Sequence, residues 1–205
     1  MSPGPITPAS VIAASLTAES VTGELRVRCA WVGSAPPYRA YHDDEWGREL
    51  HGDRELFERL SLEGFQSGLS WLTILRKRPA FREAFAGFDI AQVAGFDESD
   101  VTRLLGNAGI VRNRAKIRAT ISNAQAIVHG AVGLDQLLWS FAPPPRTMVA
   151  VVPSTSPEST AMARELRRRG LTFVGPRTAY ALMQAVGMVN DHQRGCWLAG
   201  AQIGD

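Results

Sequence analysis

The sequence has no long hydrophobic run. Hydrophobic residues make up 45% of its 205 residues, yet no apolar stretch approaches the roughly 20 residues that a helix needs to cross a bilayer. We therefore expect no contact with a membrane. Charged residues make up 20%, which is typical of a soluble globular chain and not of a disordered or fibrous one. This length suits one domain with its own hydrophobic core.

Cysteine is scarce as well. Cys29 and Cys196 are the only two, and they lie near opposite ends of the chain, so a disulfide framework is excluded. The first basic residue is Arg26, and the apolar patch 11–14 is too short for a signal peptide, which favours a cytoplasmic protein. Three early prolines predict that residues 1–26 form a disordered tail and that residues 27–205 form the folded domain.

A large net charge is also missing, because 22 Lys and Arg face 20 Asp and Glu for a total of +2. Taken alone, this total argues against a protein that binds nucleic acid by overall positive charge. The charges are unevenly placed, however. Residues 41–63 hold eight acidic and three basic side chains, whereas residues 103–118 hold five basic side chains and no acidic one. Residues 164–177 add five arginines against Glu165, so the small total hides a basic face beside an acidic region.

Helix signals are frequent after Cys29 and strand signals are rare. The fold class we predict is all-α, with many short helices rather than a long bundle. Asp53, Asp89 and Asp97 are candidate helix caps, and Pro79 is expected in the first turn of a helix of its own. The other expected elements are helices near 69–75, 101–106, 112–129, 134–141, 157–169 and 176–186, and one extended stretch at 148–152.

Each cysteine has a histidine nearby. Cys29 precedes His42 by thirteen positions, and His192 and Cys196 form H-x3-C, which would place both side chains on one face if the segment is helical. Together they offer the Cys2His2 set that suits tetrahedral Zn²⁺. Four protein ligands would leave no position for an activated water, which argues for a structural metal. Such a site would join the two ends of the folded region. The alternative is two inert buried thiols and two incidental histidines.

A glycine-containing turn, Leu104–Val111, lies between two expected helices and resembles a helix–hairpin–helix. Glycines there allow close approach to a phosphate, and the following helix N-terminus directs amide groups at it. Basic residues at 103, 112, 114, 116 and 118 flank the turn. The alternatives are contact with DNA phosphates, or an ordinary helix–helix turn beside a solvated basic face.

Aromatic residues crowd around the first two metal candidates, and Glu63 lies in an apolar stretch ending at Trp71. A carboxylate beside stacked aromatic rings suits recognition of a flat, electron-poor base, because it accepts hydrogen bonds from an amino group and favours positive charge on the ring. The alternative is an exposed glutamate on a helix surface with purely structural aromatic residues.

Taken together, these motifs resemble the bacterial DNA-3-methyladenine glycosylase I family. The similarity covers about residues 28–197, and its motifs occur in the family's order. The matching segments are Cys29–Trp31, Tyr38–Gly47, Leu62–Trp71, Ala108–Ile117, Leu138–Phe141, Pro153–Ser156, Gly170–Gly175 and Asn190–Cys196.

The resemblance implies a divergent helix–hairpin–helix glycosylase that removes 3-methyladenine from alkylated duplex DNA by hydrolysing the N-glycosidic bond. It also implies a monofunctional enzyme. No lysine matches the nucleophile of lyase-type relatives, since Lys116 fits better in the basic flank. The metal would be one structural Zn²⁺ on Cys29, His42, His192 and Cys196. We expect the enzyme to act as a monomer.

By the same resemblance, Trp71 stacks on the flipped base, Tyr41 helps to form the pocket, and Glu63 accepts a hydrogen bond from the base as the candidate catalytic residue. Trp31 and Tyr38 complete the wall. The residues implied to contact DNA are the wedge pair Gly68 and Leu69, the hairpin residues Gly106, Gly109 and Arg112, and the backbone contacts Ser154 and Thr155. Phe65 departs from the family, where a polar Gln is frequent, and it would either add stacking to the pocket or only pack.

Two other functions fit parts of the sequence. A binding module without excision would recognise damaged DNA but would not need Glu63 and Trp71 together. A zinc hydrolase would need an open metal position, which the complete Cys2His2 set does not provide.

Overall fold

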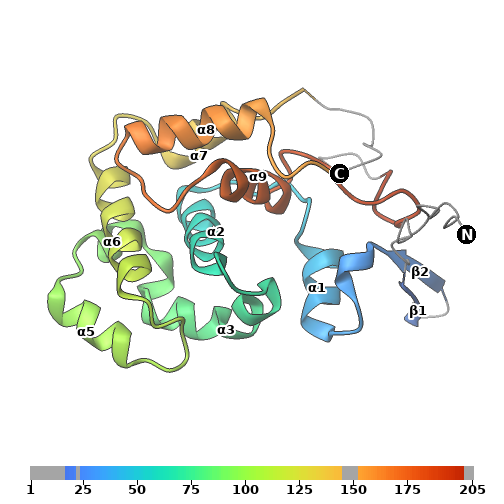
Figure 1. The fold of residues 1–205 in the computed structure, drawn as a ribbon, viewed down its shortest axis with the longest axis horizontal. Coiled ribbons are helices and arrows are strands. Elements are labelled where there is room, and N and C mark those ends of the chain that lie inside the picture. Colours follow the sequence, from blue (N-terminus) through green and yellow to red (C-terminus); the bar gives the residue numbers. More distant parts are fainter. Residues whose placement is uncertain (1–16, 22–23, 145–151, 201–205) are drawn as a thin grey trace, which may run out of the picture.

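The computed structural model describes residues 17–21, 24–144 and 152–200, so most of the stretch expected at 148–152 lies outside the described residues. Its helices surround a central helix, α2 (Asp53–Gln66), which contacts α3 (Trp71–Ala84), α6 (Arg114–Val128), α7 (Leu134–Trp139) and α9 (Pro176–Ala185) (Figure 1). The predicted all-α class with many short helices is confirmed, apart from one small hairpin. No described helix is long and apolar enough to span a membrane.

A small hairpin precedes the helices. Residues 17–21 and 24–28 form two antiparallel strands, β1 (Thr17–Val21) and β2 (Glu24–Arg28), with Thr17 opposite Arg28. These strands lie at the end of the segment that the sequence predicts as a tail, and the boundary at residue 26 stays a prediction. The hairpin is attached to the folded region because Trp197 N donates to Val27 O, and the Arg26 guanidinium lies 4.4 Å from the Trp197 ring centre. These contacts join segments too far apart in the chain to be seen as a local pattern.

Two of the three predicted helix caps are confirmed. Asp89 accepts from Gln92 N at the start of α4 (Ile90–Ala94), and Asp97 forms a capping box with Asp100 at the start of α5 (Glu98–Gly106). The prediction that Asp53 caps its own helix is wrong, because Gly52 is the N-cap residue of α2. Instead Asp53 accepts from Asp135 N at the start of α7.

Pro79 does not begin a helix. It lies inside α3, which runs unbroken from Trp71 to Ala84 and joins two helices that the sequence separates. Proline lacks the N–H for the bond to the preceding turn, so the sequence predicts a break there. Burial of Ile74 and Phe81 on either side of Pro79 holds both halves against the core.

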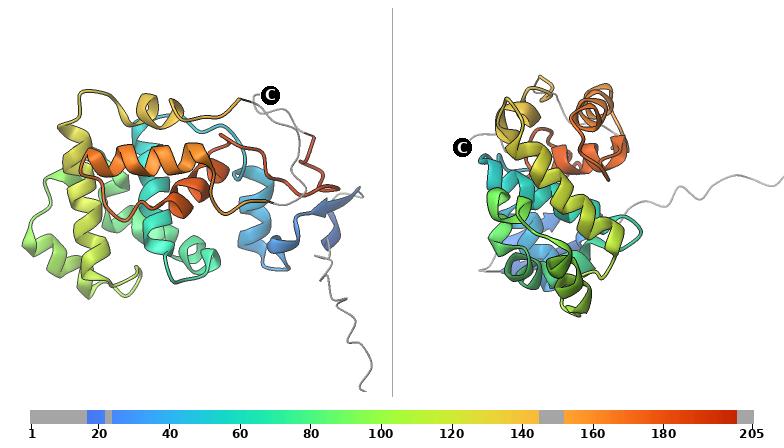
Figure 2. Two further views of the ribbon diagram at one scale, coloured as in Figure 1. Left: turned by 45° about the horizontal axis from the view of Figure 1, so that its top comes forward. Right: turned by 90° about the vertical axis from the view of Figure 1, so that its left-hand side faces the viewer.

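The remaining elements complete the two sides of the molecule. The one-turn helix η1 (Ala30–Val32) packs on α1 (Pro36–Asp44), and another one-turn helix, η2 (Ala86–Phe88), follows α3. Helix α8 (Pro157–Arg168) packs on α9, as the two views of Figure 2 show. The chain returns at the end of α9 to the segment that follows α1, because Gly47 N donates to Gln184 O and Leu50 N donates to Val186 O. This return brings the two ends of the folded chain together.

One glycine is required for that return. Gly187 has φ +78°, and a Cβ at this position would lie 2.5 Å from the backbone carbon of Arg48. Only a residue without a side chain allows this close crossing of two backbones.

Candidate active site

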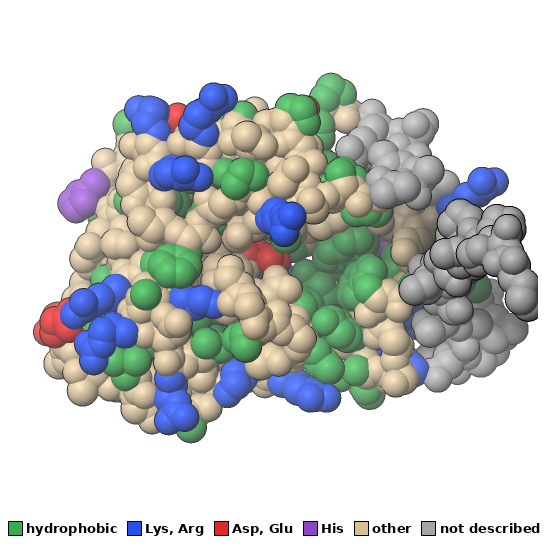
Figure 3. All heavy atoms as spheres, viewed as in Figure 1, with side chains coloured by type: hydrophobic (Ala, Val, Ile, Leu, Met, Phe, Trp, Pro, Cys, Tyr) green, Lys and Arg blue, Asp and Glu red, His purple; other side chains and the backbone are tan. Residues whose placement is uncertain are grey.

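A cavity of about 300 Å³ lies between α1, α2 and α9. It is hollowed into the face shown in Figure 3, where hydrophobic side chains gather in it and several basic side chains lie on the same face. The lining residues are Trp31, Tyr38, Tyr41, Trp46, Glu63, Gln66, Trp71, Val152, Ala181, Gln184, Asp191 and Gln193. All five residues predicted for base binding and catalysis are therefore brought together in one cavity.

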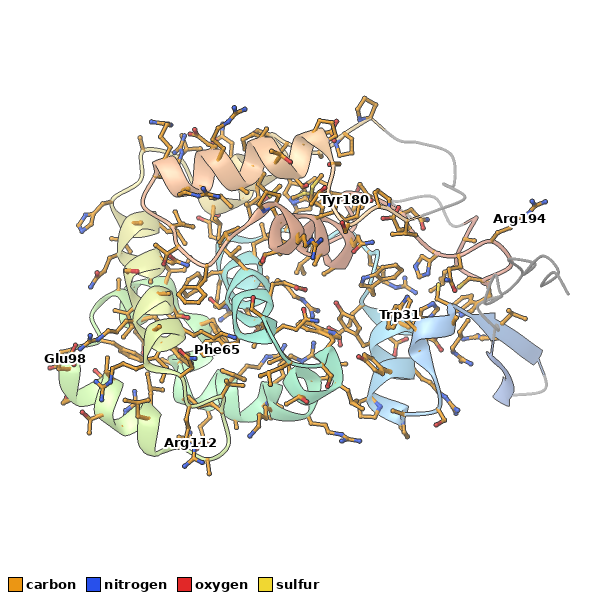
Figure 4. All side chains as sticks on the ribbon, in the orientation of Figure 1. Trp31, Phe65, Glu98, Arg112, Tyr180 and Arg194 are labelled. Carbon is orange, nitrogen blue, oxygen red and sulfur yellow. The ribbon has the colours of Figure 1, made fainter. Side chains whose placement is uncertain are left out.

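The aromatic wall is built from the first helices of the fold. The ring centres of Tyr41 and Trp71 are 5.4 Å apart, and those of Trp31 and Tyr38 are 5.6 Å apart at a steep angle. The Tyr38 hydroxyl accepts from Leu72 N, which ties this wall to the start of α3. Edge-to-face pairs of this kind are rigid, and they leave flat ring faces available to a planar ligand. Trp31 remains 37% exposed at the rim (Figure 4).

Glu63 is the buried acid of the cavity. It lies in the last turns of α2, is 5% exposed, and makes no hydrogen bond or ion pair with the described residues. Burial raises its pKa to about 8, although the charge of Arg59 acts in the opposite direction. The same burial, together with the nearby Glu63 charge, raises the pKa of the Tyr41 hydroxyl, which therefore stays a neutral hydrogen-bond donor. The expectation of an inward-facing glutamate is confirmed, and the alternative of a surface glutamate is wrong.

A partly buried ion cluster lies next to this wall. Glu45 accepts hydrogen bonds from both Arg59 and Arg78, and the two guanidinium groups lower the pKa of Glu45 to about 2, against the effect of burial. The Arg59 guanidinium lies 5.5 Å from the centre of the Tyr41 ring. Two cations thus share one carboxylate, and one of them, Arg59, lies against the ring of Tyr41, which lines the cavity.

Phe65 does not line the cavity. It is 1% exposed and packs against Phe81 and Phe85, with ring centres 4.6 and 5.8 Å away. Figure 4 shows it on the side of α2 opposite to Trp31. Because successive residues of a helix point in different directions, Phe65 faces the core while Glu63 faces the cavity. Phe65 therefore packs and adds no stacking to the pocket.

The four predicted metal ligands form one buried group. The ligand atoms of Cys29, His42, His192 and Cys196 all lie within 4.8 Å of one another. Cys196 Sγ is 3.4 Å from His42 Nε2 and 3.6 Å from His192 Nδ1, and the neighbouring thiol and imidazoles lower the pKa of the Cys196 thiol. Two thiols and two imidazoles converging on one point are the donor set of a closed tetrahedral metal site. The residues thus fit a structural metal ion that links α1 to the C-terminal segment.

A carboxylate orients one of these ligands. Asp43 accepts a hydrogen bond from His42 Nδ1 at 2.8 Å, which leaves Nε2 directed at the sulfur atoms. Asp43 is itself held by the Arg28 guanidinium and by Trp197 Nε1. A carboxylate behind a histidine is the usual support of a metal ligand, because it fixes the tautomer and the ring orientation.

The metal group borders the base cavity directly. The Trp46 ring centre is 4.7 Å from that of His192, and the Trp31 ring centre is 5.4 Å from that of His42. Both tryptophans line the cavity, so the two histidines of the Cys2His2 group support its wall.

The predicted hairpin connects α5 to α6. Gly109 is needed there because a Cβ would lie 2.8 Å from the Cβ of Ala80 on α3, and its N–H donates to Asn107 Oδ1. Gly109 therefore shapes the turn, while the space around Gly106 is open. Arg112 is exposed at the edge of the molecule (Figure 4).

The basic flank is less charged than the sequence predicts. Arg114 and Arg118 both pair with Glu98, and Arg103 pairs with Asp100, so α5 supplies the acids that balance these arginines. Arg112 has no ion-pair partner among the described residues.

Lys116 is not part of the basic flank. It is 8% exposed, and its ammonium group donates to Phe65 O at 2.9 Å and Ser67 O at 2.6 Å. Desolvation lowers the pKa of this ammonium group. Lys116 thus satisfies the carbonyl groups at the end of α2, immediately before Gly68 and Leu69. This role of Lys116 could not be recognised from the sequence, because its two partners lie 49 and 51 positions away.

The turn after α2 exposes the predicted wedge. Gly68 has φ +83°, Leu69 N donates to Gln66 O, and the Leu69 side chain is 42% exposed. Ser154 and Thr155 are exposed just before α8, where Ser156 caps the helix.

Sequence reasoning did not place Asp191, Gln184 or Gln66 in the cavity. Asp191 is 3% exposed and accepts from Tyr180 and from Gln184 Nε2. Its position directly before the metal ligand His192 is the signal that was available.

The comparisons with known proteins agree with this geometry. A family model described as methyladenine glycosylase matches residues 31–199. The chain is 43% identical over 178 residues to DNA-3-methyladenine glycosylase 1 of Escherichia coli, covering 82% of this chain and 95% of that protein. The chain belongs to the methyladenine glycosylase family.

Solved structures of the family share the fold as well. A crystal structure of 3-methyladenine DNA glycosylase I has a TM-score of 0.79 at 44% identity and covers 83% of this chain and 98% of the other. A variant of such an enzyme in complex with 3-methyladenine has a TM-score of 0.77 at 30% identity and covers 83% and 96%. Family membership favours an enzyme over a binding module or a zinc hydrolase.

Proposed function

We propose that this protein is a monofunctional DNA glycosylase that excises 3-methyladenine from alkylated duplex DNA in base excision repair. The observation that carries the proposal is the aromatic cavity with Glu63 unpartnered inside it, in a chain of the methyladenine glycosylase family. A related enzyme has been solved with 3-methyladenine bound.

Base selection follows from the charge of the substrate. Methylation at N3 gives the adenine ring a positive charge, which the faces of Trp71, Tyr41 and Trp31 favour. Glu63 accepts a hydrogen bond from the base and, when ionised, adds a negative charge beside the ring. Neutral adenine gains less from both contacts, so the cavity rejects the normal base after it has been flipped out.

The chemistry is hydrolysis at the sugar carbon C1′. The bond from C1′ to N9 breaks and its electron pair goes to the base, which leaves as neutral 3-methyladenine. A water oxygen forms the new bond to C1′ and loses a proton, and the strand keeps an abasic site. Because the base is already cationic, it leaves without protonation, and the enzyme's main tasks are to flip, hold and select it.

Contacts with DNA come from three places in the fold. Gly68 and Leu69 would fill the gap left by the flipped nucleotide, and Ser154 and Thr155 would contact the sugar–phosphate backbone. Arg112 and the open backbone around Gly106 would bind a phosphate, with Gly109 holding the turn in shape.

The metal we propose is a single Zn²⁺ on the Cys2His2 group. It would supply structural cross-linking and no reaction step, since its four positions are filled by protein ligands. We also propose that the protein acts as a monomer in the cytoplasm, where the thiols of Cys29 and Cys196 stay reduced.

The test is release of free 3-methyladenine from methylated duplex DNA, followed by chromatography. We expect the wild-type protein to release the base well above the spontaneous rate and to leave strands uncut until alkali is added. The Glu63→Gln variant should release it at least about tenfold more slowly while its melting temperature does not fall. Damage-specific binding without any release would instead identify a binding module and overturn the proposal.

A further inference from the structure

The described part of the chain exposes few large hydrophobic side chains. They are Trp31, Leu69, Val128, Val152, Phe173 and Trp197. Trp31 and Val152 line the cavity, Leu69 is the wedge, and Trp197 is covered by Arg26. Val128 is a single valine at the end of α6. Phe173, which is 44% exposed, is the one large aromatic ring among them without a role.

Phe173 also has an unfavourable backbone conformation. Its φ is +58°, in the left-handed region that a bulky residue rarely adopts. Asn123 of α6 holds the preceding residue in place, because its side chain accepts from Thr172 N at 2.8 Å and donates to Thr172 O at 3.1 Å. Leu171 and Val174 on either side are buried, so the loop between α8 and α9 is anchored at both ends. Strain of this kind that presents a side chain to solvent is typical of binding sites.

The position of Phe173 points to its ligand. Its backbone oxygen and Cβ lie 3.8 Å from the place of a Cβ on Gly64, the residue after Glu63. Phe173 and Lys116 border the same small cavity, and Lys116 holds the turn that carries Leu69. The exposed ring thus lies next to the base of the wedge turn, on the side of α2 that faces α6.

We propose that Phe173 is a second apolar contact with DNA, which packs against the bases next to the gap that Leu69 fills. The inference rests on the proposed function, because it needs duplex DNA opened at a flipped nucleotide. Once a nucleotide leaves the stack, its neighbours expose flat apolar faces, and an aromatic ring stacks on any base without regard to sequence. Apolar side chains inserted beside unstacked bases also stabilise a kinked duplex.

The experiment compares two binding constants in the same variants. The first is the Kd for a duplex with a tetrahydrofuran abasic-site analogue, measured by fluorescence anisotropy. The second is the Kd for free 3-methyladenine, measured by tryptophan fluorescence. Phe173→Ala should weaken binding to the duplex about tenfold and leave binding of the free base unchanged. Val128→Ala is the matched control, since it shortens an exposed apolar side chain at the far end of α6, and both constants should stay at the wild-type values.

A second variant separates contact with DNA from folding. Phe173→Gly removes the ring and also relieves the left-handed strain, so its melting temperature should be no lower than that of the wild type while its duplex binding falls as in Phe173→Ala. Wild-type affinity for the duplex in both variants would overturn the proposal. So would a parallel loss of free-base binding and of melting temperature, because that pattern identifies a packing role. Absence of base release by the wild-type protein would refute the proposed function and not the DNA contact, which the duplex constants test independently.

Discussion

Arg59 lies one helical turn before Glu63 on α2, yet its guanidinium bonds to Glu45 and not to Glu63. Arg78 from α3 donates to the same Glu45 carboxylate, so Glu45 holds both guanidinium groups. Glu63 is left with a buried, unpaired carboxyl group, and its pKa rises to about 8. The ion cluster therefore keeps the acid of the cavity available for a ligand.

The stability of the protein should fall as the pH rises toward 8 because of Glu63. The folded form holds a proton on Glu63 up to about pH 8, whereas the unfolded form releases it near the ordinary value of 4.5. The stabilising contribution is complete below that ordinary pKa and is lost as the pH rises through the folded pKa. Glu63→Gln should thus gain on the order of 2–4 kcal/mol over the wild type in free energy of unfolding between about pH 5 and pH 8. Urea unfolding at both pH values measures this difference.

The matched control for this pH dependence is Glu58→Gln on the same helix, whose side chain pairs with Arg82 at the surface. It should follow the wild-type curve over this range. A difference between the wild type and Glu63→Gln that does not change with pH would show that Glu63 is ionised in the folded protein.

Much of the site could be predicted because its chemistry is concentrated in short segments. Trp31, Tyr38 and Tyr41 lie on neighbouring turns of the chain, and the metal ligands consist of two local pairs. The sequence does not show which group each charged side chain pairs with in the folded protein. Lys116 and Arg114 look alike in a basic run, but one is buried on carbonyl groups of α2 and the other pairs with Glu98.

The same limit explains the errors in the fold. Proline has no N–H to donate, so the sequence predicts a helix break at Pro79. Helix α3 nevertheless continues through it, because residues on both sides of Pro79 are buried in the core. Strand β2 (Glu24–Arg28) is attached to the fold by contacts of Arg26 and Val27 with Trp197, which lies near the other end of the chain. Contacts between residues so far apart in the sequence leave no local pattern. The helices can therefore be predicted from the sequence, whereas the contacts that hold α3 and β2 in place cannot.

Removal of the metal should alter the base cavity before the protein unfolds. Trp46 and Trp31 rest on His192 and His42, so loss of the ion releases the rings that line the cavity. We expect Cys196→Ser to lose the zinc ion that we propose for this site, to shift the tryptophan fluorescence and to weaken binding of free 3-methyladenine about tenfold or more. Zinc content measured by atomic absorption should fall from one ion per chain to near zero. Full zinc occupancy in this variant would contradict the ligand set.

Trp71 should matter for excision more than for stability. Trp71→Leu keeps an apolar side chain in the wall but removes the flat face that we propose stacks on the cationic base, so kcat/KM for base release should fall by about 10-fold to 100-fold. Trp139→Leu is the control, because Trp139 lies outside the cavity and donates to Leu50 O. Its kcat/KM should remain at the wild-type value. Equal losses in the two variants would show that general destabilisation, and not the cavity wall, explains the effect.

Lys116 should couple α6 to the wedge turn. Lys116→Met keeps the length of the side chain but leaves Phe65 O and Ser67 O without their donor, which should cost about 1–3 kcal/mol in free energy of unfolding. The loosened turn should weaken binding to abasic duplex DNA, while binding of free 3-methyladenine stays unchanged because the cavity walls are intact. Arg118→Met on the same helix controls for the lost charge, since Arg118 is exposed and pairs with Glu98. If both variants lose duplex affinity equally, the effect of Lys116 is electrostatic and the turn does not depend on it.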